Sequence, residues 1–92
     1  MKRINTPETR TYRDGDFIVE IVKTSRNGDA IFDCWLSADD VGIKEYMFGL
    51  LETQPDGTRY DWSLSEAVVE ANLDEYEEDY RENHMDIKII VN

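Results

Sequence analysis

The sequence predicts an α+β domain in which a four-stranded, mostly antiparallel sheet carries one long helix on a single face. Three observations lead to this prediction. Short stretches of β-branched and aromatic residues alternate with turn signals, one long segment repeats apolar residues at helical spacing, and the chain closes on an alternating apolar stretch. A chain of 92 residues makes one domain, with the expected element order strand, strand, strand, helix, strand.

The first two strands form a hairpin. Residues 16–25 and 30–37 are rich in apolar and β-branched residues, as strands are. Between them stands Asn27-Gly28, which favours a type I′ turn because both central positions need a positive φ. Alternation places one set of side chains toward the helix, namely Phe17, Val19, Ile21, Phe32, Cys34 and Leu36. It places the other set on the outer face, namely Ile18, Glu20, Val22, Ile31, Asp33 and Trp35.

The third element is a strand over residues 43–52. A helix start at Ser37 and Asp40 is the alternative, but Gly42 and Gly49 would each cost a helix about 1 kcal/mol. The run YMFGLL favours a pleated surface instead. A turn at Pro55-Asp56-Gly57 ends the strand.

The clearest element is a helix over residues 64–82. Ser63 and Glu66 have the spacing of a capping box at its start. An apolar stripe recurs along it, made of Leu64, Val68 or Val69, Leu73, Tyr76 and Tyr80. Residues 85–92 then predict a last strand, parallel to the first and placed beside it, which gives the sheet order 3-2-1-4.

The N-terminal residues 1–15 are polar and locally basic, without periodicity. We expect a flexible arm there, followed by a single domain over residues 16–92.

Charge and cysteine content limit the function. The net charge of −11 disfavours direct binding of nucleic acid or of an anionic membrane, and it permits docking on basic proteins. Cys34 is the single cysteine, so no internal disulfide forms, which fits a reducing compartment. With no secretory signal and no run of roughly 20 apolar residues, we expect a cytoplasmic protein.

Catalytic chemistry has little support. The single histidine, His84, alternates with Glu82 and Asp86, a set that could bind a metal in an extended chain, but the spacing straddles a helix end. We expect an exposed histidine in the last helical turn instead. Cys34 lies in an apolar strand beside Asp33, which suits a buried structural thiol. The sequence therefore predicts no enzyme activity, no cofactor and no metal site.

The densest charge lies in LDEYEEDYRENH, residues 73–84, which contains six acids and one arginine. Acids that repeat at helical spacing repel one another and form a row of negative charge, similar to that of a DNA strand. Tyr76 and Tyr80 either anchor this helix to the sheet or turn outward to stack on a partner's arginine. A solvated helix face is the simpler interpretation. If the row binds a partner, the contacts are Glu66, Glu70, Asp74, Tyr76, Glu77, Glu78, Asp79, Tyr80 and Glu82.

One helix covers one sheet face and leaves the other bare or covered by the arm. Its expected apolar residues are Ile18, Val22, Ile31, Trp35, Met47 and Ile90. Such a patch is typical of an interface, and its candidates for a homodimer contact are Ile18, Val22, Trp35 and Ile90.

NLDEYEEDYRENHMDIKI resembles the acidic C-terminal helix of small phage-encoded anti-CRISPR and anti-restriction inhibitors. The resemblance is compositional and covers about a quarter of the chain. It implies a protein that occludes the DNA-binding channel of a basic effector, with the acids from Glu66 to Glu82 as contacts. The alternative function is a small homodimeric interaction module whose acids serve solubility alone.

Overall fold

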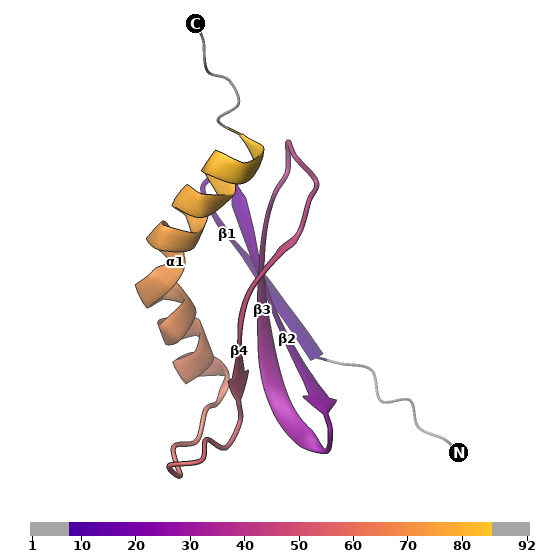
Figure 1. Ribbon diagram of the computed structural model, residues 1–92, viewed down its shortest axis with the longest axis vertical. Helices are drawn as coiled ribbons and strands as arrows, with labels where there is room; N and C mark the ends of the chain where they lie inside the picture. Colours follow the sequence, from indigo (N-terminus) through magenta and orange to yellow (C-terminus); the bar gives the residue numbers. More distant parts are fainter. Residues whose placement is uncertain (1–7, 86–92) are drawn as a thin grey trace, which may run out of the picture.

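A computed structural model of the protein describes residues 8–85. Four strands precede one helix, and they form a single antiparallel sheet in the order β1-β2-β3-β4. The elements are β1 (Glu8–Asp14), β2 (Phe17–Arg26), β3 (Asp29–Ala38), β4 (Glu45–Leu51) and α1 (Trp62–His84). Figure 1 shows the helix lying along one side of the sheet. The α+β class is confirmed, whereas the predicted order of strands and helix is not the one observed.

The main difference lies at the N-terminal end. Residues 8–14, predicted as part of a flexible arm, form β1 and pair with β2 from Glu8↔Lys23 to Asp14↔Phe17. The tight turn between them is possible because Gly15 takes a φ of 64°, a left-handed conformation open to glycine. β1 therefore occupies the edge of β2 that the sequence analysis gave to the last strand.

The predicted strand 85–92 lies, apart from Met85, outside the described residues. Met85 itself caps the helix, because its backbone N–H donates to the carbonyl oxygen of Arg81 at 2.8 Å.

The central hairpin agrees with the prediction. Asn27 and Gly28 have φ values of 55° and 85°, and the strands pair around them from Arg26↔Asp29. The inward set of side chains is buried as expected, and β4 confirms the third predicted strand.

Met47 is the exception to the predicted faces. It is buried on the helix side of the sheet, with 8% exposure, rather than on the outer face. The cause is a register shift between Cys34 and Trp35, which pairs Cys34 with Phe48 and Trp35 with Tyr46. Such a bulge adds one residue to β4 and changes the alternation of its side chains.

The helix begins earlier than predicted. Its N-cap is Asp61 rather than Ser63, and the Asp61 carboxylate accepts a hydrogen bond from the backbone N–H of Leu64 at 2.8 Å. An aspartate three residues before a free N–H satisfies it as well as a serine would. Leu64 then falls outside the buried stripe, with 39% exposure. Between the sheet and α1 lies the core, made of Phe17, Val19, Ile21, Phe32, Cys34, Leu36, Ala38, Met47, Val69, Leu73 and Tyr80.

Within residues 8–85, no helix has both the length and the apolar character that crossing a bilayer would require.

Candidate functional site

The outward side of α1 is a surface of carboxylates, which we call the acidic helix face. It consists of the exposed acids Glu70, Asp74, Glu75, Glu78, Asp79 and Glu82. Four of them follow one another at intervals of four residues, so they stand in one row along the helix. None of the six forms an ion pair with another residue of the described chain.

Glu66, at the start of the same helix, is half-exposed and partly neutralised. Its carboxylate lies 3.9 Å from the Arg10 guanidinium of β1. That guanidinium also stacks over the Trp62 ring, 4.5 Å from the centroid. Glu66 therefore helps to hold β1 against the helix and contributes less free charge than the six exposed acids.

Glu77 does not belong to the acidic helix face. Its side chain is buried, with 6% exposure, and one carboxylate oxygen has no hydrogen-bond partner among the described residues. Burial, and next a hydrogen bond to Asp14 of β1, raise the pKa of Glu77 to about 7. The prediction that Glu77 contacts a partner is therefore wrong. Glu77 stands four residues after Leu73, on the buried side of α1 with Val69, a position where an ionisable side chain is not expected.

The two tyrosines both face the sheet. Tyr80 is fully buried, packs edge-on against Phe17 with centroids 5.6 Å apart, and donates from its hydroxyl to the carbonyl oxygen of Ile43. Tyr76 is half-buried against Phe48, at 5.6 Å. The anchoring role is thus the observed one, and the prediction of Tyr80 as a partner contact is wrong.

The opposite layer is the outer face of the sheet. Ile18, Val22 and Trp35 lie there as predicted and are half-buried by neighbouring side chains, while Ile90 lies outside the described residues. Tyr46 joins them, with 47% exposure, and packs edge-on against Trp35 at 5.1 Å. Tyr46 was not predicted on this face, because its orientation depends on the bulge in β4.

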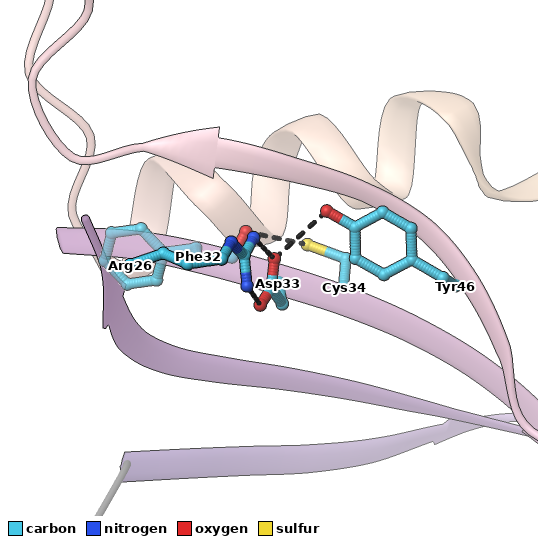
Figure 2. Close-up of polar contacts among 5 residues, drawn as sticks. All are labelled: Arg26, Phe32, Asp33, Cys34 and Tyr46. Carbon is cyan, nitrogen blue, oxygen red and sulfur yellow. Dashed lines mark hydrogen bonds and ion pairs between the residues drawn. The ribbon is translucent and has the colours of Figure 1, made fainter. Parts of the chain in front are cut away.

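A polar cluster stands in the middle of this face (Figure 2). Asp33 accepts two hydrogen bonds from the Arg26 guanidinium, at 2.9 and 3.0 Å, and a third from the Tyr46 hydroxyl at 3.0 Å. Asp33 is 6% exposed, so its charge is buried and satisfied by both partners. The Arg26 hydrogen bonds, opposed in part by burial, lower the pKa of Asp33. The carboxylate therefore stays ionised at neutral pH.

Gly49 makes room for this cluster. A Cβ atom at position 49 would lie 2.5 Å from the Tyr46 hydroxyl oxygen and 3.0 Å from a carboxylate oxygen of Asp33. Only a residue without a side chain lets Tyr46 reach across β4 to Asp33. The glycine that argued against a helix in this segment thus has a packing role in the strand.

Cys34 and His84 both pack against neighbouring side chains of the fold. Cys34 is fully buried, and burial, with a smaller effect of Asp33, raises the pKa of its thiol to about 12. His84 is not exposed as predicted, because it stacks on Tyr80 and its Nε2 contacts the Glu45 carboxylate at 2.5 Å. Asp86, the third member of the metal set considered above, lies outside the described residues. Within residues 8–85 no three potential metal ligands are grouped.

Comparison of the chain with protein-family models, with curated proteins and with solved structures gave no match.

Proposed function

We propose that this is a non-enzymatic inhibitor that docks the acidic helix face into a basic groove of a nucleic-acid-binding partner and occludes it. The observation that carries the proposal is the row of exposed acids on α1 without ion-pair partners among residues 8–85. Like charges at i and i+4 cost the helix a few tenths of a kcal/mol each. A partner's lysines and arginines would convert this repulsion into attraction.

The spacing of the acids suits such a groove. From Glu66 to Glu82 the helix axis rises by roughly 24 Å. Glu66 and the six exposed acids then provide about one charge per 4 Å, close to the value of about 3.4 Å per charge for one DNA strand. A groove built for a phosphate backbone would therefore find carboxylates at similar intervals. This mode of action is the one that the resemblance to anti-CRISPR and anti-restriction inhibitors implies.

The anchoring of α1 supports the same proposal. Tyr80, Val69 and Leu73 hold the opposite side of the helix in the core. The acids are thus presented on a rigid element, and binding requires little ordering of the chain. A reduced Cys34, buried in the core, agrees with a cytoplasmic place of action.

The test uses two variants with the same net charge. In the helix variant, Glu70, Asp74, Glu78 and Glu82 are replaced by lysine. In the control variant, lysine replaces four exposed acids outside the helix, Glu8, Asp16, Asp29 and Asp40. Both should remain folded by circular dichroism, since all eight side chains are exposed.

Each form is immobilised and used to capture proteins from a host lysate. The proposal expects a protein that the parent and the control variant retain, that the helix variant loses, and that duplex DNA releases in competition. Capture that is unchanged in the helix variant, or no protein that meets all three conditions, contradicts the proposal.

The second candidate function is a homodimeric interaction module whose acids serve solubility alone. It is favoured by the apolar residues on the outer sheet face, where Trp35 and Tyr46 form an aromatic pair. Under this alternative the helix and control variants would lose solubility to a similar degree, and the helix variant would keep its partners.

A further inference from the structure

The outer sheet face carries little net charge in a strongly acidic chain. Six of its charged side chains are matched in pairs: Arg13 with Asp39 at 2.8 Å, Arg26 with Asp33 at 2.9 Å, and Lys44 with Glu20 at 2.5 Å. Asp29, at the hairpin end of β3, is exposed and has no ion pair among the described residues. The net charge of the whole chain is −11. The helix α1, which carries the acidic helix face, lies on the other side of the sheet (Figure 1). The fold thus separates a charged surface from a nearly neutral one.

The nearly neutral face is apolar between its ion pairs. Its apolar members come from β2, β3 and β4: Ile18, Val22, Ile31, Trp35, Tyr46 and Leu51. Lys44 stands over the Trp35 ring at 5.7 Å from the centroid, and the Arg26–Asp33 pair lies among the aliphatic residues. This composition, apolar and aromatic with paired charges, is that of protein interfaces.

We propose that this face binds the same face of a second copy, so that two chains pair sheet to sheet with both acidic helix faces turned outward. The charge of the chain favours a second copy at this face rather than at another surface. Two chains of charge −11 repel each other through any surface that carries the unpaired acids. The outer sheet face is where two copies can meet without bringing those acids together.

The distances agree with this arrangement. Two sheets packed face to face lie about 10 Å apart, and each helix lies one further layer away. The two rows of acids would then stand farther apart than the Debye length of about 8 Å at physiological salt. Their mutual repulsion is therefore largely screened in the pair.

The available area predicts a weak dimer. Four strands of seven to ten residues span roughly 20 Å by 30 Å at the usual strand spacing and rise. Pairing would bury about 600 Å² per chain, or about 1,200 Å² in total, at the lower limit of specific interfaces. We therefore expect a concentration-dependent equilibrium with a dissociation constant in the micromolar range or weaker.

This inference is independent of the proposed helix docking, and salt separates the two. Docking of the acidic helix face on a basic partner weakens as salt is added. Pairing of two acidic chains through a nearly neutral, apolar face strengthens, because salt screens their long-range repulsion. Either proposal can therefore fail while the other stands.

The test is the molar mass of the full chain by analytical ultracentrifugation, from about 1 μM to about 1 mM. Trp35→Glu places an unpaired charge in the proposed interface and should weaken association on the order of 100-fold or more. Val22→Glu, on the adjacent strand, should do the same if Trp35→Glu does not fold. Leu64→Glu is the matched control, because Leu64 is 39% exposed on α1 in the opposite layer.

The proposal expects a dimer at high concentration that salt stabilises, that Leu64→Glu retains, and that folded Trp35→Glu or Val22→Glu loses. A monomer at every concentration overturns it. In that case, slow acrylamide quenching of Trp35, measured with Trp62 replaced by phenylalanine, would show that another segment of the same chain covers the face. A dimer that persists in both sheet variants, or that salt dissociates, also overturns it.

Discussion

Glu77 of α1 is buried beside Asp14, the last residue of β1, so that two carboxyl groups share one site between the helix and the sheet. Arg81 on the same helix lowers the pKa of Glu77, and Asp74 raises it, but burial and the hydrogen bond to Asp14 dominate. The pKa of Glu77 is about 7 in the folded chain, against an ordinary value of 4.5.

This pair makes stability depend on pH. Because the folded pKa is raised, the protonated carboxyl stabilises the fold fully below about pH 4.5, and this contribution is lost as pH rises through about 7. The loss is about 3 kcal/mol. Glu77→Gln keeps a hydrogen-bond donor without a charge. It should match the parent near pH 4 and exceed it in free energy of unfolding by that amount near pH 8.

Urea unfolding at several pH values measures the difference. The control is Glu78→Gln, an exposed neighbour, which should leave the pH dependence of the parent unchanged. A difference between Glu77→Gln and the parent that stays constant with pH would disprove the assignment.

Tyr80→Phe should destabilise the fold by about 1–3 kcal/mol, because the carbonyl oxygen of Ile43 then loses its buried donor. Tyr76→Phe serves as the control, since Tyr76 packs its ring against Phe48 and its hydroxyl makes no hydrogen bond among the described residues. Thermal unfolding of both variants gives the comparison. Equal losses of stability would show that the Tyr80 hydroxyl contributes nothing specific.

Gly49→Ala should cost about 1–3 kcal/mol through overpacking, because the new methyl group meets the Tyr46 hydroxyl. The same substitution in a Tyr46→Phe background should cost less, since the closest contact is gone. A double-mutant cycle of unfolding free energies measures this coupling. Strict additivity of the two substitutions would contradict the packing role of Gly49.

The cap of α1 gives a matched pair of variants two residues apart. Asp61→Ala removes the acceptor for the Leu64 N–H and should cost about 1 kcal/mol. Ser63→Ala, at the cap position that the sequence predicted, should be nearly neutral. A larger loss of stability in Ser63→Ala than in Asp61→Ala, measured by chemical denaturation, would identify Ser63 as the N-cap.

Local patterns predicted the parts of the fold that depend on neighbouring residues. The Asn27-Gly28 turn, the alternation of β2 and β3, and the long helix all follow from spacing within one element. β1 could not be predicted in this way, because its polar alternation carries no apolar period and its pairing depends on the Gly15 turn.

The candidate site was likewise predicted in part. The exposed acids of α1 follow from helical spacing and were found. Tyr80 was expected in the apolar stripe, with outward stacking as the alternative, whereas Glu77 was grouped with the exposed acids. Glu77 stands four residues after Leu73 on the buried side of α1, but burial of an acid there depends on how α1 lies against β1, which is a tertiary relationship. The Arg26–Asp33–Tyr46 cluster was missed for the same reason, because the bulge in β4 sets the orientation of Tyr46.

The central claim is that the acidic helix face binds positive charge, and the affinity for a captured partner across a salt range tests it most directly. From about 0.1 M to about 1 M salt the Debye length falls from about 10 Å to about 3 Å. The parent and the control variant should both bind at low salt and lose at least about tenfold in affinity over this range. The helix variant should not bind at all. Affinity that is independent of salt and equal in all three forms would show that the acids of α1 are only a solvated surface.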